Sequence, residues 1–391
     1  MLTSLALIFL CGLLLGSLFQ KIRLPSLLGM LLTGILLGPY VLDVLDDSIL
    51  TLSPDLRQLA LIIILSRAGL NLDLDDLKKV GRPALLMCFL PACFEIGGFL
   101  LLAPPLLGIS LLDAAVMGAV VAAVSPAVIV PRMLRLMEEG RGTEKGIPQM
   151  ILAGASVDDV FVIVLFTSFT GLYEGKGVSA AGFLQIPVSV VLGVVLGILL
   201  GVLLALFFRK FHMRDSVKIL LFLSIAFLLV ALENALKGFV PLSGLLAVMG
   251  MGAALRRRRG EVAKRLSLKF SKLWVAAELI LFVLVGAAVD IRYAAAAGAA
   301  AAAAVLGALV FRICGVACCL IKTPLSRKER FFCMLAYTPK ATVQAAIGAV
   351  PLAMGLPCGQ IVLTVAVLGI LITAPLGAFF MGLTGSRLLG A

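Results

Sequence analysis

Long apolar stretches recur along the whole chain, and they constrain its fold more than any other feature of the sequence. A stretch of about 18 or more apolar residues can cross the hydrocarbon core of a bilayer as a single helix. The chain is 62% hydrophobic and only 14% charged, with a mean hydropathy of +1.16, which is too apolar for a water-soluble domain. The sequence therefore predicts an all-α, polytopic membrane protein.

The hydropathy pattern predicts about thirteen transmembrane spans. These cover residues 2–19, 24–44, 55–72, 83–106, 111–134, 147–170, 182–208, 217–236, 240–255, 272–290, 293–321, 331–353 and 359–383.

Basic residues are sorted between the connecting loops. The net charge is +12, and most Lys and Arg residues fall in the loops that follow odd-numbered spans. By the positive-inside rule these loops are cytoplasmic, so we expect a plasma (inner) membrane protein with its N-terminus outside and its C-terminus in the cytoplasm. The run Arg256–Arg259 then faces anionic lipids on the cytoplasmic side, and we expect no nucleic-acid partner.

Short motifs of the first half recur in the same order roughly 215 residues further on, which indicates an internal repeat. The matched stretches are 24–29 with 240–244, 68–73 with 285–290, and 124–127 with 337–340. Spans 1–6 therefore correspond to spans 8–13, with span 7 as a connector. Because an odd number of spans separates equivalent helices, the two halves have inverted topology, as in secondary transporters.

Two equivalent spans are interrupted by proline. Ser125-Pro126 lies in span 5 and Thr338-Pro339 in span 12. Proline removes a backbone hydrogen bond and disfavours helix in the residue before it, so we expect a broken helix at each position. Matched interruptions of this kind point to a transporter's substrate site, because the broken ends expose partial charges at membrane depth.

Two adjacent acids, Asp158 and Asp159, lie near the middle of span 147–170. A charge at that depth costs at least ~2.5–3.5 kcal/mol, so the pair indicates an ion or proton pathway, the alternative being a neutralised pair kept for packing. The two side chains point about 100° apart on a helix, so one can face an aqueous cavity while the other turns to a basic partner. Lys340 is either that partner of Asp158 or the cation that offsets the broken end of span 12.

Such an acid can bind two kinds of ligand. In a low dielectric beside a second acid it holds its proton more tightly, and once deprotonated it is a hard oxygen ligand for a small alkali cation. Competition between a proton and a cation for one site is the minimum machinery for exchange.

The same repeat places Glu95 and Arg312 at equivalent positions in spans 4 and 11. Positions related by an axis in the membrane plane can meet near the midplane, and these two residues have opposite charges. We therefore expect a buried Glu95–Arg312 ion pair, either as a brace between the halves or with a direct role in coupling.

The stretches 124–131, 156–159 and 339–345 together resemble monovalent cation/proton antiporters, in particular the NHA-type sodium(lithium)/proton branch that carries an Asp-Asp pair. The resemblance implies that Asp159 is the principal carrier of cation and proton, with Asp158 beside it and Ser125 as a further ligand of the transported Na⁺. It also places Ser125 and Thr338 where two broken helices cross.

The resemblance further implies a homodimer that works by an elevator-like movement. Its dimerisation domain comprises residues 1–72 and 217–290, its connector helix residues 182–208, and its moving core residues 83–170 and 293–383. Electrogenic relatives have a lysine where this chain has Arg312, which cannot readily release a proton, so electroneutral exchange is favoured.

Other functions also fit parts of the pattern. Potassium/proton exchange remains open within the same fold, and a cation channel could use the two aspartates for selectivity. An intramembrane aspartyl protease is disfavoured because Asp158 and Asp159 share one helix, whereas that chemistry needs two acids from separate segments. We expect no enzymatic activity and no resident cofactor, the ligands being Na⁺ or Li⁺ and H⁺.

Overall fold

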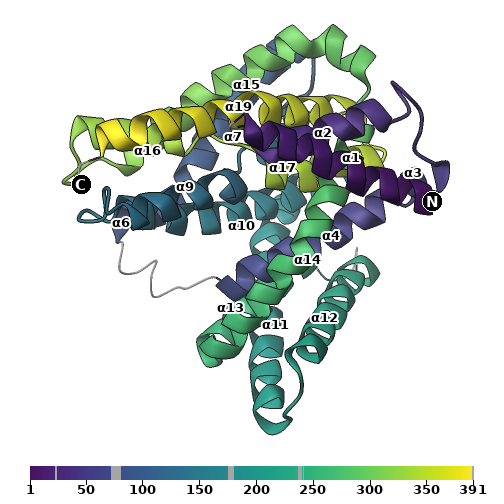
Figure 1. Ribbon diagram of the computed structural model, residues 1–391, viewed down its shortest axis with the longest axis vertical. Helices are drawn as coiled ribbons and strands as arrows, with labels where there is room; N and C mark the ends of the chain where they lie inside the picture. The colour runs from purple at the N-terminus through teal and green to yellow at the C-terminus, as the bar shows by residue number, and fades with distance from the viewer. Residues whose placement is uncertain (23, 72–80, 175–179, 237–239, 241, 390–391) are drawn as a thin grey trace. The chain divides into compact units, whose positions relative to one another are not determined.

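The computed structural model describes residues 1–22, 24–71, 81–174, 180–236, 240 and 242–389. Within these residues every regular element is a helix, which confirms the predicted all-α fold (Figure 1). The helices are α1 (Leu2–Lys21), α2 (Ser26–Leu37), α3 (Asp47–Thr51), α4 (Ser53–Asn71), α6 (Arg82–Met87), α7 (Leu90–Leu107), α8 (Leu111–Val121), α9 (Pro126–Glu138), α10 (Ile147–Glu174), α11 (Ala180–Lys210), α12 (Asp215–Ala235), α13 (Gly244–Arg258), α14 (Gly260–Ala287), α15 (Ile291–Cys319), α16 (Arg327–Ala336), α17 (Thr342–Ile347), α18 (Val350–Ala353) and α19 (Gly359–Leu388).

Many of these helices have the length and composition of membrane spans. In the described part of the chain, eight are long and apolar enough to cross a bilayer, and three shorter apolar helices cover Ser26–Leu37, Leu111–Val121 and Thr342–Ala353. Their outer faces are apolar: on α11, for example, Val191, Val195 and Leu199 are 58%, 58% and 55% exposed. This confirms a multi-pass membrane protein. The count of thirteen stays a prediction, because several predicted spans consist of short helices.

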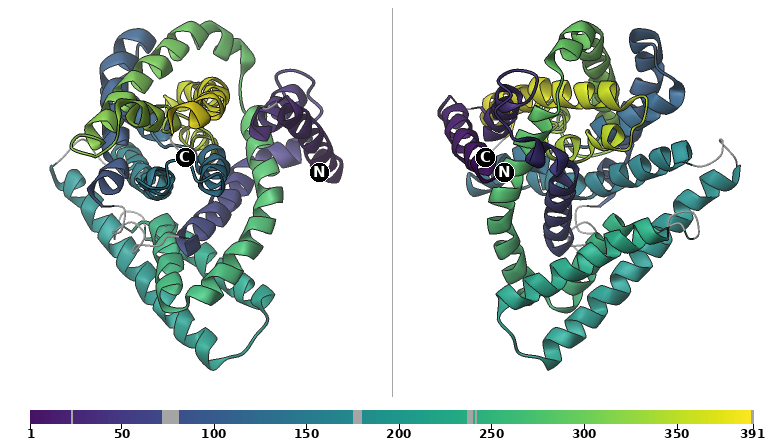
Figure 2. Two further views of the ribbon diagram at one scale, coloured as in Figure 1. Left: turned by 60° about the vertical axis from the view of Figure 1, so that its left-hand side comes forward. Right: turned by 90° about the vertical axis from the view of Figure 1, so that its right-hand side faces the viewer.

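The chain forms two compact units. The first contains Met1–Pro54, Asp75–Phe169 and Leu279–Ala391, and the second contains Asp55–Leu74 and Thr170–Glu278. In the second unit α13 packs against both α11 and α12 (Figure 2). The predicted dimerisation, connector and core domains stay predictions, because they are defined by assembly and movement. Residue 72 of the first dimerisation segment and Asp73 and Pro241 of the repeated motifs lie outside the described residues.

In the first unit α7 packs closely against α15, and α19 packs against α8, α9 and α15–α18. Two glycines allow α7 and α15 to approach. A Cβ atom at Gly98 of α7 would lie 3.1 Å from Cα of Ala308, and one at Gly315 of α15 would lie 2.8 Å from Cα of Pro91. Glu95 and Arg312 lie between these two contacts along their helices, so the close packing brings the two charged positions together.

Both predicted helix breaks are present. Helix α8 ends at Val121 and α9 begins at Pro126, while α16 ends at Ala336 and α17 begins at Thr342. We call residues 122–125 the first break and residues 337–341 the second break. The backbone amide of Ser125 donates to the carbonyl of Pro339 at 2.8 Å, so the two interruptions meet.

Candidate functional site

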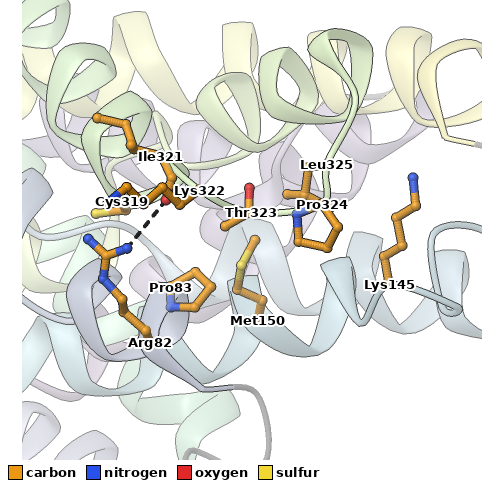
Figure 3. A pocket seen from close by; sticks show the side chains of 10 residues that line it. All are labelled: Arg82, Pro83, Lys145, Met150, Cys319, Ile321, Lys322, Thr323, Pro324 and Leu325. Atoms are coloured by element: carbon orange, nitrogen blue, oxygen red, sulfur yellow. Dashed lines mark hydrogen bonds between the residues drawn. The ribbon is translucent and has the colours of Figure 1, made fainter.

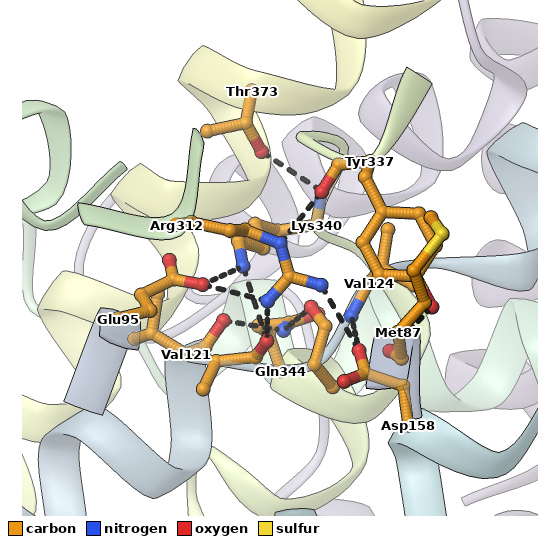
Figure 4. A network of polar contacts seen from close by, with 12 residues as sticks. Met87, Glu95, Val121, Val124, Asp158, Arg312, Tyr337, Lys340, Gln344 and Thr373 are labelled. Carbon is orange, nitrogen blue, oxygen red and sulfur yellow. Dashed lines mark hydrogen bonds and ion pairs between the residues drawn. The ribbon is translucent and has the colours of Figure 1, made fainter. Parts of the chain in front are cut away.

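Glu95 of α7 contacts two cations in the interior of the first unit (Figure 4). Its Oε2 atom lies 2.8 Å from Nη1 of Arg312 and 2.5 Å from Nζ of Lys340, and all three residues are at most 1% exposed. The Glu95–Arg312 pair predicted from the repeat is therefore present. Lys340 pairs with Glu95 rather than with Asp158, because the second break directs its side chain toward α7 and the end of α8.

Arg312 also binds the carboxyl-terminal ends of both broken helices. Its Nε donates to the carbonyl of Tyr337, just past α16, at 2.6 Å, and its Nη1 donates to the carbonyl of Ala122, just past α8. Such carbonyls lack helical partners and carry the partial negative charge of a helix end, which a cation stabilises. Lys340 Nζ lies 3.3 Å from the same Ala122 oxygen. The broken end of α16 is therefore contacted by Arg312, whereas Lys340 contacts the end of α8.

Asp158 of α10 holds the first break in place. Its Oδ2 accepts the backbone N–H of Val124 at 2.8 Å and lies 3.0 Å from Nη2 of Arg312, and the residue is fully buried. The expectation that one aspartate turns to a basic partner is met, and that partner is Arg312. In Figure 4 the guanidinium lies between Glu95 and Asp158.

The second break is held in an equivalent way. The backbone N–H of Lys340 donates to Oγ1 of Thr373 in α19 at 2.9 Å, and that hydroxyl donates to the carbonyl of Gly369 at 2.7 Å. In the sequence, the spacing from Val124 to Lys340 and the spacing from Asp158 to Thr373 are both close to the spacing between equivalent positions in the two halves of the chain. The repeat thus uses an acid in one half and a neutral hydroxyl in the other. Sequence reasoning missed Thr373, although the offset from Asp158 points to it.

Asp159 differs from its neighbour. It is 8% exposed, and within the described residues it makes no ion pair and its Oδ1 has no hydrogen-bond partner. Among the described residues, Oδ1 of Asp158 and Oγ of fully buried Ser125 likewise have no hydrogen-bond partner. A buried oxygen without a partner costs about 1–3 kcal/mol, and more when it is charged. These three oxygens, from the residues predicted to bind the cation, are therefore available to a ligand.

The other predicted residues of the breaks have structural contacts. Pro126 is the first residue of α9, where its missing N–H costs nothing. The hydroxyl of Thr338 donates to the carbonyl of Leu335 at 2.8 Å, which stabilises the end of α16 rather than contacting α10. Pro339 contributes the carbonyl that accepts the amide of Ser125.

Gln344 of α17 is a further polar residue that sequence reasoning did not single out. It is fully buried, and its Nε2 donates to the carbonyls of Val121 and Ala123 at 2.9 and 2.7 Å. It therefore binds the end of α8 from the second half of the chain, as Arg312 and Lys340 do. An isolated polar residue in an apolar stretch, four positions after Lys340, was the signal available in the sequence.

The charges of this centre balance without Asp159. Arg312 and Lys340 contribute two positive charges, and Glu95 and Asp158 contribute two negative ones. Ionised Asp159 adds one uncompensated negative charge in a buried setting, which is costly unless a proton or a cation neutralises it. The arrangement therefore suits reversible binding of one positive charge.

This chain is similar to known proteins over nearly its whole length. A protein-family model described as "Sodium/hydrogen exchanger, transmembrane" matches residues 5–384. The chain is 35% identical over 407 residues to human sodium/hydrogen exchanger 9B2, covering 98% of this chain and 74% of that protein. It is 31% identical over 407 residues to human sodium/hydrogen exchanger 9B1, covering 99% and 78%.

A solved structure has the same fold. The sodium proton antiporter MjNhaP1 from Methanocaldococcus jannaschii, determined at pH 8, superimposes with a TM-score of 0.87 at 22% identity, covering 100% of this chain and 99% of that one. The family model and the relatives match nearly the whole sequence, and they lead to one conclusion: this chain belongs to the sodium/hydrogen exchanger family.

Proposed function

We propose that this protein exchanges Na⁺ or Li⁺ for H⁺ across a membrane, with Asp159 as the principal carrier. The observation that carries the proposal is that Asp159 is a buried acid without a cationic partner among the described residues, beside a centre whose other charges are balanced. A proton and an alkali cation each carry one positive charge, so either can neutralise Asp159, and the two cannot bind there together. This competition couples the two fluxes.

Asp158 and Ser125 complete the proposed cation site. Each has a buried oxygen without a hydrogen-bond partner in the described structure, and oxygen ligands suit a hard cation. Asp158 keeps its other oxygen on Val124 and Arg312, so it can bind the cation without leaving the first break. The cation is cargo here, and no resident cofactor or chemical reaction is part of the proposal.

The balance of charge favours electroneutral exchange. Because Arg312 and Lys340 are both paired with carboxylates, one positive charge at Asp159 is exchanged for another. We further propose an elevator-like movement of residues 83–170 and 293–383 in a homodimer, with the N-terminus outside and the C-terminus in the cytoplasm of a plasma (inner) membrane. The sorted basic loops and the similarity to the NHA-type branch support these assignments.

The test is exchange in proteoliposomes under an imposed pH gradient. We expect saturable H⁺ efflux on addition of Na⁺ or Li⁺, which Asp159→Asn abolishes while the protein stays folded. The matched control is Glu138→Gln, which changes an exposed acid at the end of α9 and keeps transport. Substantial exchange by the Asp159→Asn variant would contradict the assignment.

The same vesicles separate the alternatives. Exchange driven equally well by K⁺ would make the protein a potassium/proton exchanger, since nothing in the described site fixes the size of the cation. Flux that does not saturate and needs no counter-ion would indicate a channel.

A further inference from the structure

Outside the carboxylate site, the first unit contains a cavity of about 290 Å³ (Figure 3). Three basic residues line it: Arg82 at the start of α6, Lys145 in the turn before α10, and Lys322 in the loop after α15. The rest of the wall is largely apolar and includes Pro83 and Met150. The cavity therefore combines a cationic rim with an apolar floor.

The cavity lies where three spans end. Arg82 begins one candidate span, Lys145 lies just before the span that begins at Ile147, and Lys322 lies just after the span that ends at Cys319. The end of a span marks the level at which hydrocarbon gives way to headgroups and water. All three basic residues belong to loops that the positive-inside rule assigns to the cytoplasmic side.

Only one of the three cations is neutralised within the described chain. Lys145 Nζ lies 2.9 Å from both carboxylate oxygens of Glu329, which also caps α16. Arg82 has a single long contact, from Nη1 to the carbonyl of Ile321 at 3.5 Å. Lys322 is exposed and makes no ion pair with a described residue, and its backbone has a φ of 61°. Among the described residues, the rim thus carries two positive charges that no acidic side chain neutralises.

We propose that this cavity binds the phosphate headgroup of an anionic phospholipid from the cytoplasmic leaflet. The phosphate contacts Arg82 and Lys322, and the first carbons of the lipid lie against the apolar wall. Arginine and lysine are the usual side chains for phosphate, and a basic pocket between spans is a recognised setting for lipid headgroups. The apolar wall and the position at three span ends favour a lipid over a free phosphate ion.

A lipid in this position would join three segments of the transport site. Arg82 leads through α6 to the helix that carries Glu95, and the loop with Lys322 connects α15, which carries Arg312, to α16. Met150 lies on α10, the helix of Asp158. The headgroup therefore tethers the ends of the elements that hold the charged centre. The binding site itself does not depend on which cation is transported.

The test is thermal unfolding of the purified protein in detergent micelles, titrated with phosphatidylglycerol, phosphatidylcholine or inorganic phosphate. We expect phosphatidylglycerol to stabilise the protein and the other two ligands to have little effect. In Arg82→Gln/Lys322→Gln the half-maximal phosphatidylglycerol concentration should rise about 30-fold, since each basic residue near a headgroup contributes about 1 kcal/mol. The matched control is Arg209→Gln/Lys210→Gln, which removes two exposed basic residues at the end of another span, outside this cavity, and should leave the titration unchanged.

Several results would overturn the proposal. Equal loss of affinity in both double variants would show that phosphatidylglycerol recognises only the general surface charge. Stabilisation by inorganic phosphate with the same dependence on Arg82 and Lys322 would assign the cavity to a free anion. Should the double variant fold poorly, Lys322→Gly removes the cation while suiting the left-handed backbone at this residue, and an unchanged phosphatidylglycerol titration in this variant would also refute the assignment.

Discussion

Replacing Glu95 by glutamine tests the charged centre most directly. Glu95 Oε2 contacts both Arg312 and Lys340, and all three residues are essentially inaccessible to solvent. Removing one partner of a buried ion pair costs about 3–5 kcal/mol, and here two cations lose their shared counter-charge, so we expect about 5 kcal/mol. At about 2 °C per kcal/mol, the melting temperature should fall by about 10 °C.

The second-site change distinguishes charge balance from simple packing. Glu95→Gln/Lys340→Gln removes one charge of each sign and should recover about half of the loss. Arg312→Gln should not rescue in this way, because Arg312 also holds Asp158 and the carbonyls of Ala122 and Tyr337. The assay is thermal unfolding in detergent followed by size-exclusion fluorescence, with Glu138→Gln as the exposed control. A fall of less than about 2 °C in Glu95→Gln, or strictly additive losses in the double variant, would refute the reasoning.

Three further predictions concern other parts of the first unit. Thr373→Val removes the acceptor of the second break and should cost about 1–3 kcal/mol in thermal unfolding, whereas Thr373→Ser should retain most of the stability. Gly315→Ala presses a methyl group against the backbone of α7 and should cost about 1–3 kcal/mol, whereas Gly97→Ala, which has open space around it, should be neutral or stabilising; equal effects would contradict the close helix contact. Burial raises the pKa of Glu329, but hydrogen bonds from Lys145 and from the amide and hydroxyl at the start of α16 outweigh it and leave the pKa below its ordinary 4.5. Its contribution to stability is therefore present above the unfolded-state pKa and lost as the pH falls through the lower folded-state value, so Glu329→Gln should lower the melting temperature at about pH 7, and this difference from the unaltered protein should shrink as the pH falls into the acidic range.

The sequence predicted those features of the site that depend on the backbone preference of a single residue or on the internal repeat. Proline removes a backbone hydrogen bond, so Pro126 and Pro339 were each expected to interrupt their span, and both breaks are present, whereas Pro104, Pro105 and Pro375 lie inside continuous helices. The Glu95–Arg312 pair followed from the offset between the halves, which converts sequence positions into spatial neighbours near the midplane. Neither inference needed the direction of a side chain.

Side-chain partners that depend on helix rotation were not predictable in this way. Lys340 reaches Glu95 because the second break reorients the chain, and the sequence offered only Asp158 or a helix end as candidates. The pairing of Asp158 with Arg312, and the contacts of Gln344 to the end of α8, depend on how α10 and α17 are turned about their axes. The number of spans also stays a prediction, since hydropathy does not distinguish one long helix from two short ones.

The contact between Glu95 and Arg312 has a consequence for the symmetry of the fold. The two residues occupy the same position in the two halves of the chain, yet they form an ion pair at 2.8 Å. Two identical half-length proteins assembled about a two-fold axis would place the same residue on both sides, and like charges would repel there. An assembly of two identical halves could therefore not form this pair, which requires that the two halves differ at this position.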